Sequence, residues 1–368
     1  MAGEWETEAV RRLGIELPIV SAPMGGGPST PALVAAVSEA GGLGSLAGGY
    51  LSPDRLRADI AAVRAATSKP FAVNLFVPTP VEPSAEEVER ALAAVEPHQL
   101  HLELPPRPTA EGPWAEDFDA QVAVLVEERV PVVSFTFGLL PAGAVAALHD
   151  AGSLLAGTAT TVEEAVTLVS AGSDLVCAQG SEAGAHRGTF LAPAEQSLVG
   201  TLALVPQVCD AVDVPVLAAG GIMDGRGVAA ALSLGAGAAV LGTAFMQTPE
   251  AGTSAPHRRA LAAATETSTA LTTQITGRMA RGIENRLMRD LRDVTVPPYP
   301  VMHTLTAELR RRAAERDEPD LMALWCGQGI RLATELPAAE LVRRLADDAA
   351  ATIAGLARTA GVASRVNR

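Results

Sequence analysis

The chain has 368 residues, of which 48% are hydrophobic and 19% are charged, and its formal net charge is −14. This composition is typical of a folded globular protein and excludes an intrinsically disordered one. The negative charge argues against general binding to nucleic acid or to anionic lipid, because both require a basic protein surface.

The three cysteines (Cys177, Cys209 and Cys326) lie far apart in the sequence and form no CxxC pair. An odd number of isolated cysteines does not suit a disulfide framework and offers no zinc-binding pattern. The N-terminal segment MAGEWETEAVRR is charged and lacks the apolar core of a signal peptide. We therefore expect a cytoplasmic protein without a metal site.

Short apolar runs of the kind that form strands buried on both faces recur along the first two-thirds of the chain. They span residues 18–24, 42–46, 71–76, 132–137, 153–157, 174–178, 214–219 and 238–242. Helical patterns separate most of them, such as 32–40, which follows a capping Ser-Thr-Pro and ends at two glycines. Eight strand-helix units in about 250 residues predict an α/β fold, a (β/α)8 TIM barrel, with a doubly wound open sheet as the alternative.

Two intervals depart from this rhythm. Residues 77–131 are too many for one helix, so we expect a helix over 84–95 and an irregular excursion. The strand-helix pattern ends near residue 248, and helical patterns follow over 304–316 and 338–357. We predict a barrel over 1–250, with the excursion at about 77–131, and a smaller, mostly helical substrate-capping region over 251–368.

The uncharged stretch 227–248 requires a membrane check. It divides at residues 234–237 into a helix-like half and a strand-like half. Neither half is long enough to cross a bilayer, so we expect a buried helix followed by a buried strand and no membrane partner.

In a TIM barrel, the loops at the carboxyl ends of the strands build the active site. Gly220 and Gly221 follow the seventh strand and Gly242 and Thr243 follow the eighth, where backbone N–H groups can bind a phosphate, helped by the next helix. The alternative is that these glycines only turn the chain.

Asn74 and Gln179 are amides at strand ends, and they suit a ligand with alternating donors and acceptors, such as the edge of a flavin ring. The alternative is that both are satisfied core amides.

The segment AQGSEAGAHRGTF follows the sixth strand and holds His186 in a glycine-rich stretch. A histidine there faces the inferred pocket, and with an ordinary pKa near 6.5 it is competent as a base at neutral pH. Its neighbour Arg187 is expected to anchor the loop. Arg278 and Arg281 either attract an anionic substrate or, as is commoner, lie solvated on the surface.

In this order, the motifs PIVSAPMGGG, FAVNLF, CAQGSEAGAHRGTF, PVLAAGGI, VLGTAF, GRMARGIENRL and WCGQG resemble the nitronate monooxygenase family, also called 2-nitropropane dioxygenases, and its class I branch in particular. The resemblance runs over nearly the whole chain. It implies a TIM barrel that binds FMN, a capping region, and oxidative denitrification of alkyl nitronates by O2 to a carbonyl compound and nitrite.

Carried onto this sequence, the resemblance implies a catalytic role for His186. It also implies that FMN is contacted by Ala22, Met24, Asn74, Gln179, Gly184, Gly220, Gly221, Gly242 and Thr243. The partners it implies are a small nitronate and O2, with a homodimer left open.

Several departures from the family pattern leave the substrate open between alkyl nitronates, propionate 3-nitronate and neutral nitroalkanes. Met279 replaces a proline, Ala185 replaces a common glycine, and Tyr50 and Tyr299 are the only tyrosines. Whether His186 acts as a base or as a hydrogen-bond donor also stays open. The alternatives are an FMN-dependent enoyl-acyl-carrier-protein reductase using NAD(P)H and a catalytically silent flavin-binding protein.

Overall fold

The predicted strands form one closed parallel barrel. The computed structural model describes residues 5–105 and 112–360. Its barrel strands are β1 Ile19–Ser21, β2 Gly44–Ala47, β3 Phe71–Phe76, β4 Val132–Thr136, β5 Leu154–Ala159, β6 Leu175–Gln179, β8 Val216–Ala219 and β9 Ala238–Leu241. They hydrogen-bond in the order β1-β9-β8-β6-β5-β4-β3-β2, and a parallel bridge from Val20 to Leu43 brings β1 back to β2. The (β/α)8 barrel is therefore confirmed, and the open sheet is wrong.

Helices cover the outside of the barrel, as expected for parallel strands joined by crossovers. They are α2 Pro31–Glu39, α3 Pro53–Ala66, α5 Phe118–Glu127, α6 Ala142–Asp150, α7 Val162–Ser170, α8 Thr201–Ala211 and α9 Gly225–Ser233. The first helix, α1 Glu8–Leu13, packs Ala9, Val10 and Leu13 against the apolar side chains at the amino ends of the strands. This helix therefore covers the amino ends of the strands.

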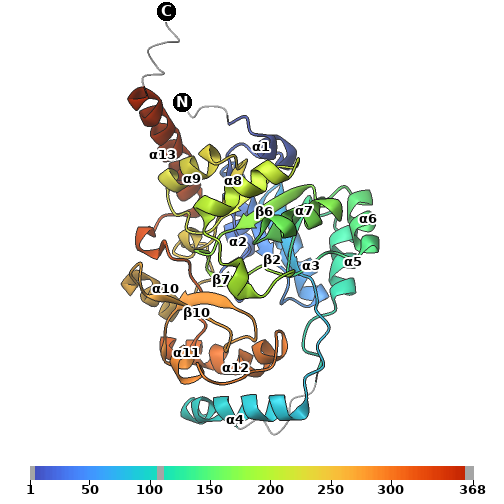
Figure 1. Cartoon of the computed structure of the whole chain (residues 1–368), viewed down its shortest axis with the longest axis vertical. Helices are drawn as coiled ribbons and strands as arrows, with labels where there is room; N and C mark the ends of the chain where they lie inside the picture. Colours follow the sequence, from blue (N-terminus) through green and yellow to red (C-terminus); the bar gives the residue numbers. More distant parts are fainter. Residues whose placement is uncertain (1–4, 106–111, 361–368) are drawn as a thin grey trace, which may run out of the picture.

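A second hydrophobic core lies beyond the carboxyl ends of the strands. Its elements are α4 Ala85–His101, α10 Ala255–Ala263, β10 Thr269–Thr272, β11 Ala280–Ile283, α11 Arg286–Asp290, α12 Val301–Glu315 and the 3-10 helix η3 Pro319–Leu321. Figure 1 shows α10, α11 and α12 gathered in one lobe, with α4 along its outer side. In this core Val88 and Val95 of α4 join Leu305 and Leu309 of α12. The excursion after β3 thus supplies one wall of the capping region.

The last helix, α13 Ala338–Thr359, returns to the barrel, where Leu341 and Leu345 join the main core beside α9. The remaining short elements are η1 Ala194–Ser197, η2 Thr243–Phe245 and η4 Ile330–Leu332. The division into residues 1–250 and 251–368 remains a prediction. None of the helices within the described residues combines the length and the apolar character needed to span a membrane.

Two features differ in detail from the sequence expectations. The helix expected over 84–95 continues to His101 through Pro97, because Val95, His98 and Gln99 are buried on one face beyond the predicted end. The capping region also contains an antiparallel sheet of order β10-β11-β7, in which β7 is Ala185–His186. The histidine of the glycine-rich segment is thus fixed by strand pairing.

A buried carboxylate on α7 holds the far end of this segment. Glu164 accepts hydrogen bonds from the backbone N–H and the hydroxyl of Thr160, at 2.7 and 2.6 Å. It also accepts from the Thr189 hydroxyl at 2.9 Å and from the N–H groups of Phe190 and Leu191 at 2.6 and 3.1 Å. Burial opposes ionisation of Glu164, but these donors outweigh it and hold the pKa of the carboxyl below its ordinary value.

Replacing Glu164 with glutamine should lower the free energy of unfolding by about 2–4 kcal/mol, because an amide N–H2 would face groups that are themselves donors. Chemical denaturation at neutral pH measures this, with the exposed neighbour Glu163→Gln as the matched control. Since the folded pKa of Glu164 is depressed, its contribution is complete above the unfolded pKa and is lost as the pH falls through the folded value. A difference between the two variants of less than about 0.5 kcal/mol would contradict this role.

Candidate active site

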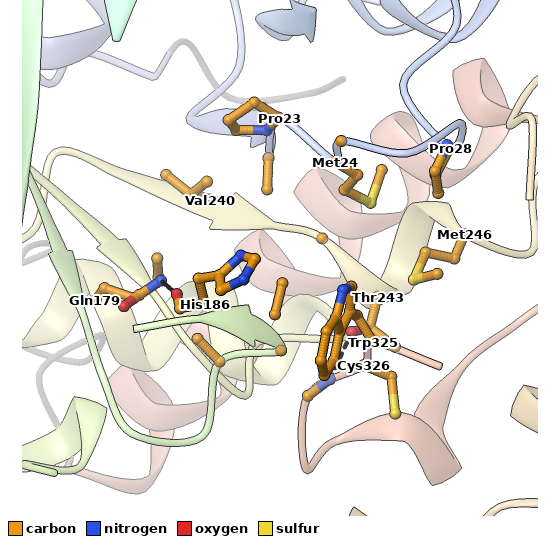
Figure 2. A pocket seen from close by; sticks show the side chains of 18 of the residues that line it. Pro23, Met24, Pro28, Gln179, His186, Val240, Thr243, Met246, Trp325 and Cys326 are labelled. Atoms are coloured by element: carbon orange, nitrogen blue, oxygen red, sulfur yellow. Dashed lines mark hydrogen bonds between the residues drawn. The ribbon is translucent and has the colours of Figure 1, made fainter. Parts of the chain in front are cut away.

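One cavity collects all the site residues selected from the sequence. It lies at the carboxyl ends of the barrel strands, and its lining includes Ala22, Met24, Asn74, Gln179, Gly184, His186, Gly220, Gly221, Gly242 and Thr243. Asn74 lies within β3, and the others end or follow β1, β6, β8 and β9. Figure 2 shows Gln179 and His186 on one side of the cavity and Thr243, Trp325 and Cys326 on the other.

The two strand-end amides are held by the protein itself. Asn74 is buried and donates from Nδ2 to the hydroxyls of Ser134, at 3.1 Å, and Thr136, at 3.4 Å. Gln179 donates from Nε2 to the carbonyl oxygen of His186 at 3.0 Å, and its Oε1 accepts from the N–H of Gly188 at 2.9 Å. Gln179 therefore fixes the backbone of the histidine segment, a role that the sequence did not indicate.

The glycine turns are required by close backbone approaches. Gly220 and Gly221 have φ of +118° and +70°, which other residues rarely adopt. A Cβ on Gly184 would lie 2.4 Å from the carbonyl carbon of Cys326, so the histidine segment packs directly against the WCGQG turn. The N–H of Gly327 in that turn donates to Thr243 Oγ1 at 2.9 Å. The WCGQG turn thus connects the loops after β6 and β9.

The helix after β8 does not contribute in the way the sequence suggested. The carboxylate of Asp224 accepts hydrogen bonds from the N–H groups of Arg226 and Gly227, at 3.0 and 3.3 Å, and so caps α9. A Cβ on Gly225 would lie 2.4 Å from Cβ of Asp348 on α13, so this helix end is also packed against protein. The turns at 220–221 and 242–243, in contrast, line the cavity with their backbone.

His186 sits in a dry, largely aromatic environment. Its Nε2 lies 2.9 Å from Oγ1 of the buried Thr276. The ring centroids of Tyr299, Phe137 and Trp325 are 5.6, 5.8 and 5.8 Å from its own. Burial, with smaller contributions from the charges of Arg278 and Arg310, lowers the pKa of His186 to about 3. The imidazole is therefore neutral at pH 7, with a pKa well below the ordinary value of about 6.5.

Arg187 anchors the segment, as predicted. It is fully buried and donates to the carbonyl oxygens of Gln179, Gly180 and Ser197 at 2.7 to 3.0 Å, and to Gln179 Oε1 at 3.0 Å.

The solvated-surface interpretation of the other two arginines was wrong. Arg278 lies over the ring of Phe137 at 3.9 Å and donates to the carbonyl oxygens of Arg187 and Thr189. Arg281 is buried and donates to the carbonyl oxygen of Ser181 at 3.1 Å. Both hold the histidine segment in place.

Sequence reasoning missed residues that the capping region and the β2 loop bring to the site. The ring of Tyr50 stacks on that of His303, with centroids 4.3 Å apart and planes at 4°. His303 and Arg310 line the cavity from α12, and Trp325 lines it from the WCGQG turn. Both tyrosines of the chain, Tyr50 and Tyr299, lie here. Because the chain has only these two, their positions in the sequence could have pointed to the site.

Burial shifts the titration of these groups toward their neutral forms. It raises the pKa of Tyr50 to about 12 and lowers the pKa of His303 well below its ordinary value. Cys177 lies within β6, and burial raises its pKa to about 12. It is therefore a thiol at neutral pH and no thiolate nucleophile.

Comparisons with known proteins identify relatives of this chain over most of its length. A family model described as nitronate monooxygenase matches residues 8–348. A probable nitronate monooxygenase from Staphylococcus aureus is 41% identical over 338 residues, which cover 90% of this chain and 94% of that protein.

Two solved structures are similar as well. Nitroalkane oxidase from Streptomyces ansochromogenes has a TM-score of 0.87 and 44% identity, covering 95% of this chain and all of the other. FabK from Thermotoga maritima has a TM-score of 0.76 and 30% identity, covering 95% of this chain and 98% of the other. The match over residues 8–348, with relatives at 41% and 44% identity, shows that the chain belongs to the nitronate monooxygenase family of oxidoreductases.

Proposed function

We propose that the protein binds FMN in this cavity and oxidises alkyl nitronates with O2, giving a carbonyl compound and nitrite. The observation that carries the proposal is the convergence of the sequence-selected residues on one cavity at the strand ends of a family barrel. The resemblance of the whole chain to nitroalkane oxidase from Streptomyces ansochromogenes supports the same chemistry.

The shape of the cavity suits FMN. Loops that turn through glycine, as at Gly220 and Gly221, present backbone N–H groups to a phosphate without a basic side chain. A Cβ on Gly242 would lie 3.5 Å from Cβ of Ala22 and 3.9 Å from Sδ of Met24, so it would occupy space between the ends of β1 and β9. These residues would hold the cofactor, and FMN, when bound, supplies the redox chemistry.

Hydrogen bonding around His186 fixes the orientation of its ring. The Thr276 hydroxyl lies 2.9 Å from His186 Nε2 and 3.2 Å from the carbonyl oxygen of Arg278. Because this hydroxyl can donate or accept, the contact holds the imidazole in either neutral tautomer. His186 thus enters the reaction as a neutral imidazole of fixed orientation.

The lowered pKa of His186 favours one substrate class over another. A free-enzyme pKa of about 3 makes the imidazole a poor base for removing the α-proton of a neutral nitroalkane. A nitronate arrives without that proton, and its negative charge would raise the pKa of a histidine beside it. His186 would then bind and orient the nitro group and carry a proton only once the anion is present.

The direct test is aerobic turnover by flavin-loaded protein. With alkyl nitronates and with propionate 3-nitronate we expect oxygen uptake and nitrite release, and FMN as the flavin released on denaturation. Likeness to FabK makes NAD(P)H oxidation with an enoyl thioester the necessary comparison. Turnover of the enoyl thioester and none of the nitronates would replace the proposed function, and protein that cannot be loaded with FMN would refute it.

Replacing His186 with asparagine should lower kcat for nitronates by about 100-fold or more, the range typical of a lost proton-transfer or orienting group. FMN content should not change. His149→Asn, on the exposed end of α6, is the matched control and should retain wild-type kinetics. Unchanged kinetics in His186→Asn would remove His186 from the mechanism.

The low pKa of His186 also predicts the pH profile. Because the free enzyme holds this imidazole neutral, kcat/KM for a nitronate should show no ionisation between about pH 5.5 and 8.5 after correction for the substrate. Protonation of His186 should reduce kcat/KM only as the pH approaches its pKa of about 3. An acid limb near pH 6.5 that disappears in His186→Asn would contradict the buried, neutral histidine.

A further inference from the structure

The cavity carries one positive charge and no negative one. Among the described residues that line it, Arg310 is the sole arginine or lysine, and none is an aspartate or glutamate. The chain as a whole has a net charge of −14. A cation that faces the cavity of so acidic a protein requires a specific explanation.

The charge of Arg310 has no carboxylate partner within residues 5–105 and 112–360. Its Nε donates to Thr306 Oγ1 at 3.2 Å, and its Nη2 donates to the carbonyl oxygen of His303 at 2.9 Å and lies 3.2 Å from His303 Nδ1. No described hydrogen bond engages Nη1. Burial lowers the pKa of Arg310, and the only charge interaction that opposes this comes from Tyr50.

Other arginines of the chain are satisfied differently. Arg311, the next residue on α12, is exposed and pairs with Glu315. Backbone carbonyl oxygens of the histidine segment accept hydrogen bonds from Arg187, Arg278 and Arg281. Among the arginines that the structure describes, only Arg310 combines a place in the cavity lining with an unengaged nitrogen. Burying a cation without a counter-charge is costly, so an anionic ligand would stabilise this arrangement.

We propose that Arg310 forms an anion subsite that binds a planar oxyanion group of the substrate and determines specificity for anionic substrates. Arg310 lines the cavity next to His303, whose ring stacks on Tyr50, and its Nη1 remains unengaged. The N–H groups of this nitrogen can donate charge-assisted hydrogen bonds to the oxygens of a nitronate or of a carboxylate. The identity of the reacting substrate rests on the proposed function. Two groups of the substrate offer such an oxyanion: the nitronate itself, or a carboxylate elsewhere on the molecule.

The test compares flavin-loaded wild type with Arg310→Gln, Arg310→Met and Arg310→Lys. Arg311→Gln removes the same charge one residue away on the solvent side of α12 and serves as the matched control. Inorganic nitrate, a planar monoanion, is titrated calorimetrically into each protein. KM and kcat are then measured for ethylnitronate and for propionate 3-nitronate, and FMN content is recorded for each variant.

Both charge-removing variants should weaken nitrate binding and raise KM by about tenfold or more, with kcat changed by less than about threefold. Arg310→Lys should recover most of the binding, and Arg311→Gln should match wild type. A rise in KM for both substrates identifies the nitronate as the bound anion. A rise confined to propionate 3-nitronate identifies the carboxylate. Having two charge-removing variants guards against one that does not fold.

Unchanged nitrate affinity and KM in the folded charge-removing variants would overturn the subsite. Equal losses in Arg311→Gln would overturn it as well, because they would reflect only the overall field of α12. Loss of FMN from Arg310→Gln and Arg310→Met would reassign the guanidinium to the cofactor. Arg310-dependent nitrate binding without nitronate turnover in wild type would refute the proposed function and leave the anion subsite standing.

Discussion

The candidate active site depends on the hydrogen bonds that the guanidinium of Arg187 donates. The guanidinium joins the end of β6, at Gln179 and Gly180, to Ser197 before α8, through hydrogen bonds to buried oxygens. The segment that it organises is rich in glycine and has little intrinsic conformational preference. With Arg187 in place, the adjacent His186 can pair with β11 and face the cavity. A polar residue buried at this depth acts as a structural centre, because its hydrogen bonds connect the end of β6 to the segment before α8.

The barrel and its ligand-facing residues could be read from the sequence because both depend on local pattern. Strands such as Phe71–Phe76 are buried on both faces and appear as continuous apolar runs. The glycines after β8 and β9 mark the turns, and parallel strands bring their carboxyl ends to one edge. His186 stood out because a glycine-rich segment rarely carries a lone histidine. These features predicted the barrel and part of the cavity lining that it supplies.

The capping side of the site could not be read in this way. His303 and Arg310 lie on α12, whose pattern is that of an ordinary amphipathic helix. Only its packing above the barrel brings His303 against Tyr50, which follows β2. Strand β7 has two residues, too short for any periodicity, and it exists because β11 pairs with it. The low pKa of His186 has the same origin, since residues distant in the chain remove water from its ring.

The position of α4 has a consequence for synthesis of the chain. Its apolar face, with Val88 and Val95, packs on side chains of α12, but α12 begins only at Val301. At translation rates of about 5–20 residues per second, α4 leaves the ribosome roughly 10–40 s before its partner. During that interval the barrel strands after β3 emerge while this face is still uncovered. The capping region can therefore complete its hydrophobic core only after the whole barrel sequence has been made, although α4 is synthesised before most of the barrel strands.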